Sequence, residues 1–213
     1  MLKFGSRGKL VGAIQTVLGI NPTTDYFGEQ TQQLVKEFQR DNGLTPDGVI
    51  GYKTLLELGK SINLSANFTL YEFIHSNTAV ASNIQNFPKD EHFENLKRLA
   101  ATMQEVRDSV GKPMRISSGF RSAALNKAIG GSMTSAHAKG LAADFKIIGL
   151  PNTRAMAAAI TAIDGLEYDQ LILEFPDASS SWIHLGLSVG NPRQQRLTAV
   201  RRNGKTAYIQ GHV

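Results

Sequence analysis

The sequence of 213 residues predicts an α+β protein in which a small three-helix bundle precedes a larger α+β domain with a mainly antiparallel sheet. Three observations predict this fold. Helical apolar spacing dominates residues 1–60, a longer apolar stripe at helical spacing covers 91–110, and two strand-like segments separated by a polar turn follow. We expect a first domain at 1–60, a polar linker at 61–67 and a second domain at 68–213.

The composition limits the function classes. It is that of an ordinary globular protein, and the absence of cysteine excludes disulfides and leaves His, Asp and Glu as metal ligands. No apolar run is long enough to predict membrane insertion, and the start of the chain lacks signal-peptide features, so we expect a protein held in a host cytoplasm until its release. The net charge of +5 favours an anionic partner. Recognition motifs for nucleic acid are missing, so we expect none to bind, and we interpret the basic run 196–205 as a solvated face.

An internal repeat organises the first domain. The segment "DYFGEQT" at 25–31 returns as "DGVIGYKT" at 47–54. In each copy Asp and Gly are typical of a tight turn, and helical apolar spacing follows. A further stripe at helical spacing precedes both copies at residues 11–18. These patterns predict three short helices around one small core.

The segments "LVGAIQTVLG" and "DYFGEQTQQLVKEFQRDNGLTPDGVIGYKTL" resemble the peptidoglycan-binding three-helix module of many wall hydrolases. The matching dipeptides are Ile14-Gln15, Phe27-Gly28, Phe38-Gln39, Gly43-Leu44 and Asp47-Gly48. Tyr26 departs from the family, which usually has Gly there. The resemblance implies that peptidoglycan is the partner of this domain; a three-helix spacer without a ligand is the alternative.

In the second domain, which begins near Phe68, a helix is predicted at 91–110 and is closed by Gly111 and Pro113. "MRISSGF" at 114–120 predicts a buried strand, and an alanine-rich helix follows at 153–163. "DQLILEF" and "SWIHLGLS" predict two strands, and the polar turn "PDASS" between them favours a hairpin.

The stretch "SAHAKGLAADF" sets His137 and Asp144 seven positions apart. A continuous helix would separate their Cα atoms by about 10 Å and a straight strand by about 23 Å, so neither lets two short side chains converge easily. Gly140, at the midpoint, favours a turn in a backbone conformation closed to other residues. We therefore expect a folded-back loop.

His184 stands inside the apolar strand "WIHLGL", where it is either a core residue or a ligand. Together with His137 and Asp144 it would supply three ligands for one Zn²⁺ ion, which leaves a tetrahedral position for water. Hydrolysis also needs a proton acceptor that is not a ligand. Glu174 is best placed, because the predicted hairpin brings it beside His184; a solvated strand end is the alternative. His75, His92 and His212 are expected at the surface or at helix caps.

The segments "ISSGFRSAALNKAIGGSMTSAHAKGLAADF" and "DQLILEF…WIHLGLS" resemble the zinc D-alanyl-D-alanine carboxypeptidase family, which includes phage wall endopeptidases and shares its fold with the hedgehog signalling domain. The resemblance implies a zinc peptidase domain. His137, Asp144 and His184 would be the zinc ligands and Glu174 the general base. It further implies that Arg121 holds substrate and that Ser135 accompanies it near the peptide carbonyl.

Two departures from this family bear on the site. Phe120 replaces the tyrosine of the Gly-Tyr-Arg element, and Ser181 stands where many members place the base. Asp169 and Asp177 are the lesser candidates for that role. Arg121 can also be interpreted without the family, because a planar guanidinium polarises a carbonyl and stabilises an oxyanion. A structural arginine that bridges loops is its alternative.

These observations predict a phage-type endolysin, a monomer that binds the wall and cuts its stem peptides with zinc-activated water. It would act as an L-alanyl-D-glutamate or D-alanyl endopeptidase or carboxypeptidase. The alternative is a non-enzymatic envelope-binding protein whose zinc site is structural, which requires a closed fourth ligand that the sequence does not supply.

Overall fold

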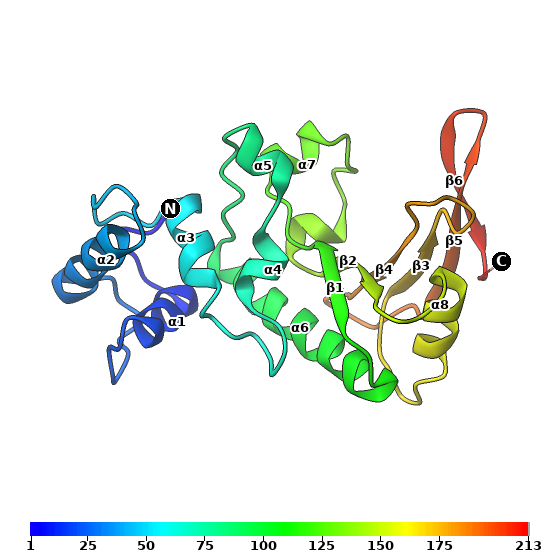
Figure 1. Ribbon diagram of the computed structural model, residues 1–213, viewed down its shortest axis with the longest axis horizontal. Coiled ribbons are helices and arrows are strands. Elements are labelled where there is room, and N and C mark those ends of the chain that lie inside the picture. The colour runs from blue at the N-terminus through cyan, green and yellow to red at the C-terminus, as the bar shows by residue number, and fades with distance from the viewer. Residues whose placement is uncertain (213) are drawn as a thin grey trace.

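The computed structural model describes residues 1–212 and divides into a helical N-terminal part and an α+β remainder (Figure 1). The N-terminal helices are α1 (Lys9–Val17), α2 (Glu29–Asp41) and α3 (Tyr52–Gly59). The later helices are α4 (Leu70–Ile74), α5 (Asn77–Ala81), α6 (Asp90–Val110), α7 (Ala123–Ala128), the 3₁₀ helix η1 (Ala136–Lys139) and α8 (Thr153–Thr161). No helix of the described residues combines the length and apolar character needed to cross a membrane.

Six strands form one sheet in the order β1-β2-β4-β3-β5-β6. They are β1 (Met114–Ser118), β2 (Ala142–Ile147), β3 (Gln170–Glu174), β4 (Trp182–Gly186), β5 (Gln195–Arg202) and β6 (Lys205–Gln210). Every neighbouring pair is antiparallel except β3 and β5, which run parallel. The expected α+β class with a mainly antiparallel sheet is confirmed, as is the hairpin of β3 and β4.

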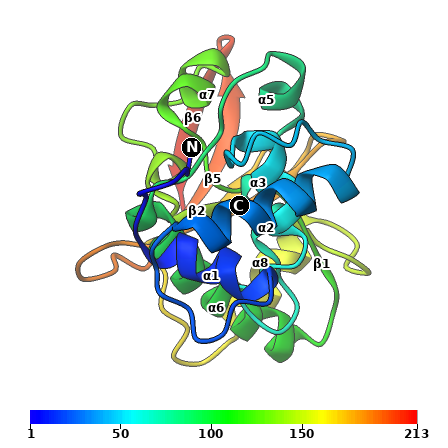
Figure 2. The ribbon, with the colours of Figure 1, turned by 90° about the vertical axis from the view of Figure 1, so that its left-hand side faces the viewer.

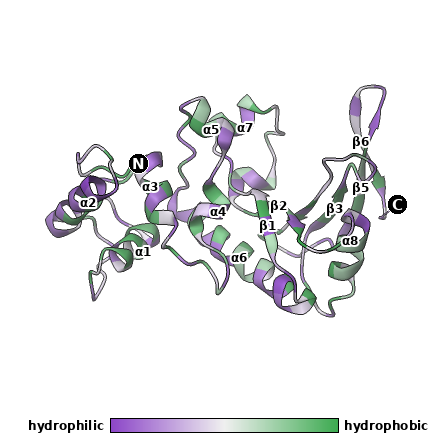
Figure 3. Ribbon diagram, viewed as in Figure 1, coloured by the Kyte–Doolittle hydropathy of each residue, from purple (hydrophilic) through white to green (hydrophobic). Residues whose placement is uncertain are grey.

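The two faces of the sheet have different roles, because side chains alternate along each strand. Phe145, Leu173 and Ile183 belong to the main core, where α8 packs against β2, β3 and β4. Asp144 and His184, on the intervening positions, lie on the opposite face. In Figure 3 the middle of β3 is hydrophobic, whereas α2 is largely hydrophilic. The helices therefore cover one face, and the other carries Asp144 and His184 beside a small apolar cluster of Ile172, Leu197 and Ala199.

Two buried glutamines account for the internal repeat of the first 60 residues. Gln15 and Gln39 are each 1% exposed. Each side-chain amide donates to a backbone carbonyl of the turn that follows it and to a threonine hydroxyl, Thr31 for Gln15 and Thr54 for Gln39. The predicted correspondence of Thr31 and Thr54 is thus a shared hydrogen-bonding pattern that fixes each turn on its helix.

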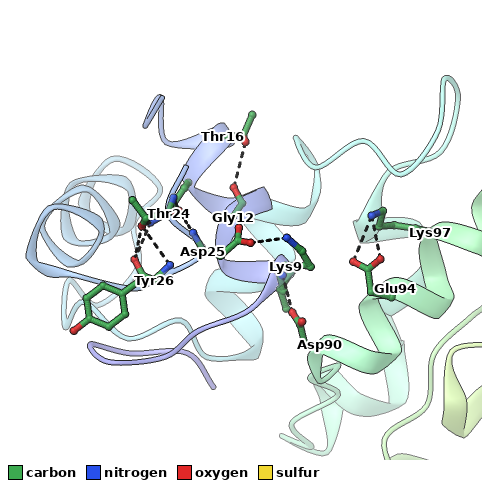
Figure 4. A network of polar contacts seen from close by, with 11 residues as sticks. Lys9, Gly12, Thr16, Thr24, Asp25, Tyr26, Asp90, Glu94 and Lys97 are labelled. Atoms are coloured by element: carbon green, nitrogen blue, oxygen red, sulfur yellow. Dashed lines mark hydrogen bonds and ion pairs between the residues drawn. The ribbon is translucent and has the colours of Figure 1, made fainter. Parts of the chain in front are cut away.

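The helical module packs directly against the rest of the chain. Ile62, inside the expected linker, is 4% exposed and belongs to a core that continues from α1 to the sheet. The Tyr52 hydroxyl donates to the Ile74 carbonyl at 2.8 Å, and Asp90 at the start of α6 reaches the first turn of α1 beside Lys9 (Figure 4). Figure 2, viewed from the N-terminal end, shows α1, α2 and α3 in front of the remaining elements. The predicted boundaries at 60 and 68 stay predictions.

The basic run 196–205 is exposed at its arginines, as expected, but it forms β5 and the turn into β6. Leu197, Thr198 and Ala199, between Arg196 and Arg201, are buried, and the strand pairs with β3. Asn203 and Gly204 both have positive φ, the conformation of a two-residue hairpin turn that Asn-Gly favours. The run is therefore mostly a strand whose arginine side chains are exposed.

Candidate active site

Three side chains converge on the face of the sheet that the helices leave uncovered. His137 Nε2 lies 3.3 Å from Asp144 Oδ1 and 3.2 Å from His184 Nδ1, and these last two atoms are 2.9 Å apart. The exposed fractions of the three side chains are between 3% and 12%. Among the described residues, this is the group of three His, Asp or Glu side chains that could hold a metal ion. The structure thus brings together the three predicted ligands.

The first two ligands are delivered by the turn that the sequence predicts. His137 lies on η1 and Asp144 on β2, with Gly140 between them at a φ of 71°. A side chain at Gly140 would also place its Cβ 2.8 Å from the backbone oxygen of His92. Glycine is therefore required for its left-handed conformation and for the close approach of α6.

The third ligand is placed by strand register. Asp144 on β2 and His184 on β4 are directly opposite each other in the antiparallel ladder. Directly opposite residues put their Cβ atoms about 5 Å apart on the same face, within reach of one shared ion. The sheet itself therefore fixes two of the three ligands.

The protonation states of the ligands suit a cation. His137 Nδ1 donates to the Gly119 carbonyl at 2.7 Å, which leaves Nε2 with its lone pair towards the other ligands. Burial lowers the pKa of His137, although Asp144 acts in the opposite direction. Burial would raise the pKa of Asp144, but His137 and His184 outweigh it and hold that pKa below its usual range. The set is two imidazoles and one carboxylate.

Arg121 lines the same cleft and is tied to the ligand carboxylate. Its Nη2 donates to Asp144 Oδ2 at 2.6 Å, and its Nε donates to Ser118 Oγ at 2.9 Å. The contact seen in the structure therefore orients Asp144, and the substrate-holding role of Arg121 stays a prediction. The remaining N–H groups of the guanidinium are available to a ligand in the cleft.

A buried asparagine that no sequence motif singles out supports this loop. Asn86 is fully buried; its side-chain amide donates to the Phe120 carbonyl at 3.0 Å, and its oxygen accepts from the Ser122 N–H at 2.7 Å. Arg121, between them, is held in place by these two bonds. The Phe120 ring packs on His92 with centroids 4.8 Å apart and does not line the main cleft.

Glu174 lies at the end of β3, opposite Trp182, and lines the cleft that contains the ligand set. Burial raises the pKa of Glu174 to about 7, against the lowering effect of His184. No hydrogen bond or ion pair holds its carboxylate within the described part of the chain. Asp169 also lines the cleft but is paired with Arg193.

Two other positions weighed for the base are less favourable. Asp177 is 81% exposed at its side chain and pairs with Arg154 outside the cleft. Ser181 carries no carboxylate. Glu174 is therefore the unpaired carboxylate nearest in the sheet to the ligand set.

The cleft has a volume of about 790 Å³ and runs between the segment 130–139 and the β5–β6 hairpin. Ser135, which precedes η1, lines it as expected for a residue near the substrate. Thr206 and Tyr208 from β6 also line it, and neither was predicted from the sequence. The Asn-Gly turn before them was the signal that could have predicted the hairpin.

The remaining histidines take no part in the ligand set. His92 accepts a hydrogen bond from the Lys89 N–H at the start of α6, and His212 donates to the Leu171 carbonyl. His75 stacks on Tyr71 with centroids 4.9 Å apart. Their predicted surface or capping roles agree with these contacts.

Comparisons with known proteins match both parts of the chain. Residues 8–58 match the family described as putative peptidoglycan binding domain, and residues 66–186 match Peptidase M15. A zinc D-Ala-D-Ala carboxypeptidase from Streptomyces albus G is 29% identical over 154 residues, which cover 67% of this chain and 60% of that protein. The M15 match spans more than half of the chain and includes all three candidate ligands. The chain therefore belongs to the Peptidase M15 family.

Proposed function

We propose that this protein is a zinc peptidase that binds peptidoglycan through its N-terminal helices and cleaves the stem peptides of the wall in the cleft of its second domain. The observation that carries the proposal is the convergence of His137, Asp144 and His184 beside an unpaired Glu174. The peptidoglycan-binding match at 8–58 and the zinc carboxypeptidase relative support the same substrate class.

The donor set fits zinc. Two imidazole nitrogens and one carboxylate oxygen are ligands that Zn²⁺ takes in catalytic sites, and three protein ligands leave a position open. The Gly119 carbonyl and the Arg121 guanidinium orient the first two ligands from behind, as outer partners of metal ligands do. Bound zinc supplies a Lewis acid and makes a neighbouring water more acidic.

The residues of the chain then divide the remaining work. Glu174 accepts a proton from the water that attacks the peptide carbonyl, and returns that proton to the leaving amine as the carbon–nitrogen bond breaks. Free N–H groups of Arg121 donate to the carbonyl oxygen as negative charge develops on it. Ser135, on the near wall, contributes a hydroxyl to the bound peptide. The raised pKa of Glu174, about 7, suits a group that both takes and gives a proton near neutrality.

The finer role we propose is that of an endolysin, which reaches the wall from the host cytoplasm. An anionic wall attracts a chain with a net charge of +5, and two linked sites increase the local concentration of the enzyme on an insoluble polymer. The bond cleaved is the L-Ala to D-Glu link, a D-Ala cross-link or a terminal D-Ala. Mass spectrometry of fragments released from purified peptidoglycan identifies which.

The experiment that tests the peptidase compares zinc-loaded wild type, Glu174→Gln and the exposed control Glu105→Gln on purified peptidoglycan. We expect wild type and Glu105→Gln to release the same fragments and Glu174→Gln to lose at least about 100-fold in rate while it retains one zinc per chain. A near wild-type rate for Glu174→Gln would overturn the role of that residue.

The alternative of a structural zinc in a non-enzymatic envelope-binding protein is tested by chelation. No fourth His, Asp or Glu joins the ligand group among residues 1–212, and the group faces a cleft. We therefore expect a chelator to abolish cleavage while circular dichroism shows a retained fold. Unfolding on chelation would instead favour the structural site.

A further inference from the structure

The far wall of the cleft is built by a part of the chain beyond the family match. The M15 match ends at residue 186, at the end of β4, whereas the sheet continues through β5 and β6. In Figure 1 the β5–β6 hairpin rises at the right-hand edge of the sheet, whereas α7 and the loop after it lie further left. Thr206 and Tyr208 of β6 line the cleft with Arg121 and the ligand set. The hairpin thus lies outside the matched range and faces the site.

Strand register places Tyr208 in the same row as Glu174. Trp182, Glu174, Ala199 and Tyr208 are successive partners across β4, β3, β5 and β6, so their side chains lie on one face. Neighbouring strands are about 4.8 Å apart, which sets the backbones of Glu174 and Tyr208 about 10 Å apart. The residue between them is an alanine, so no large side chain separates the carboxylate from the phenol.

The Tyr208 hydroxyl is a free hydrogen-bond donor. The residue is 57% exposed, and no partner in the described part of the chain bonds to its hydroxyl. Partial burial, with the negative charges of Glu174 and Asp144, raises the pKa of Tyr208, so the phenol stays protonated at neutral pH. Tyr208 is also the one tyrosine among the residues that line the cleft.

Arg121 and Tyr208 stand at opposite ends of this arrangement. Arg121 bonds to Asp144 on β2, and the order β2-β4-β3-β5-β6 then places His184, Glu174 and Tyr208 progressively further across the sheet. A peptide that lies across the strands with its scissile carbonyl at Arg121 and Glu174 extends towards β6 on its other side. Its next polar group then comes within reach of the phenol.

We propose that the Tyr208 hydroxyl donates a hydrogen bond to the peptide substrate on the side of the scissile bond opposite Arg121. The β5–β6 hairpin is then a specificity-determining wall of the cleft. The substrate group that accepts this hydrogen bond is a carbonyl or carboxylate oxygen of a stem peptide. This inference rests on the proposed peptidase function.

The chain carries its own reporter for the test. Trp182 is the single tryptophan and lines the cleft in the same row as Tyr208. Titration of the metal-free protein with a synthetic stem pentapeptide ending in D-Ala-D-Ala, followed by Trp182 fluorescence, measures binding without cleavage. We expect Tyr208→Phe to raise Kd about three- to tenfold, the value of one hydrogen bond, with unchanged thermal stability.

The matched control is Tyr71→Phe, which removes a phenol hydroxyl on α4, outside the cleft, and should leave Kd unchanged. On the zinc-loaded enzyme we expect KM to rise for Tyr208→Phe by a similar factor, with zinc content unchanged. If Tyr208→Phe has the same Kd and the same KM as an active wild type, this inference alone is overturned. A wild type that neither binds nor cleaves any stem peptide would overturn the proposed function as well.

Discussion

The carboxylate of Asp90, at the start of α6, accepts a hydrogen bond of 2.9 Å from the backbone N–H of Leu10 in the first turn of α1. Gly8 occupies the N-cap of α1 and has no side chain to do this, so the cap comes from the other domain. A Cβ at Gly8 would lie 2.6 Å from Asp90 Oδ1, which explains the glycine. The carboxylate also lies at the positive end of two helix dipoles.

We predict that Asp90→Ala lowers the free energy of unfolding by about 1 kcal/mol, the usual value of a lost N-cap. The loss should be seen in urea unfolding followed by circular dichroism. Asp164→Ala, at an exposed position after α8, is the control and should change stability by less than about 0.5 kcal/mol. Equal stability of the two variants would show that the contact with Leu10 contributes nothing.

Gln39→Ala is predicted to destabilise the N-terminal module more strongly. The Gln39 side chain accepts from the buried Gly48 N–H and donates to the Val49 carbonyl. Its removal leaves the Gly48 N–H without a partner and the Val49 carbonyl with the Gly51 N–H as its remaining donor. We expect a loss of about 2 kcal/mol in thermal or urea unfolding. Gln33→Ala, which removes an exposed bond to Glu37, serves as the control and should be nearly neutral. A neutral Gln39→Ala would mean that water replaces these bonds.

Asp144→Asn is predicted to lose zinc while the protein stays folded. The substitution removes the negative charge of this ligand and of its ion pair with Arg121, so we expect zinc affinity to fall about 100-fold or more. Competition with a chromophoric chelator measures the affinity, and circular dichroism tests the fold. The control Asp164→Asn should bind zinc as wild type does. Wild-type zinc affinity in Asp144→Asn would place the metal elsewhere.

The raised pKa of Glu174 predicts a pH dependence of stability in the metal-free protein. Because the folded-state pKa is about 7 and the ordinary value is 4.5, the folded protein binds more protons between these values. The contribution of Glu174 to stability therefore falls as pH rises from about 4.5 to 7. Burial of neutral His137 acts in the opposite direction, because its pKa is lowered. The difference in unfolding free energy between wild type and Glu174→Gln isolates the first effect.

In urea unfolding, we expect wild type to lose stability relative to Glu174→Gln as pH rises from 5 to 7.5. Bound zinc should shift this loss of stability to lower pH, because a neighbouring cation favours the ionised carboxylate of Glu174. A pH-independent difference would indicate that Glu174 is solvated in the folded protein.

The local elements of the site could be predicted from the sequence because their causes are local. Gly140 marks a left-handed turn, and the polar segment between β3 and β4 marks a hairpin that sets Glu174 beside the strand of His184. These features depend on residues within a few positions of one another. The loop around Arg121 differs, because Asn86 supports it from 35 positions away. No periodicity or spacing reports such a contact.

The β5–β6 hairpin was missed for another reason. The density of arginines in 196–202 indicates a solvated surface, and it masks the short buried segment Leu197–Ala199 at the centre of a strand that pairs with β3. Parallel pairing also depends on a partner more than 20 residues away, which the local pattern does not specify. The Asn203-Gly204 turn was nevertheless visible in the sequence.

The contacts that join the helical module to the second domain leave no free tether between them. Ile62 is buried in the shared core, and Tyr52 and Asp90 bridge the two parts. If the module binds the wall as we propose, the cleft lies at a constant distance from the part of the peptidoglycan that the module binds. The protein then cuts at one fixed distance from the point where its helical module binds the wall.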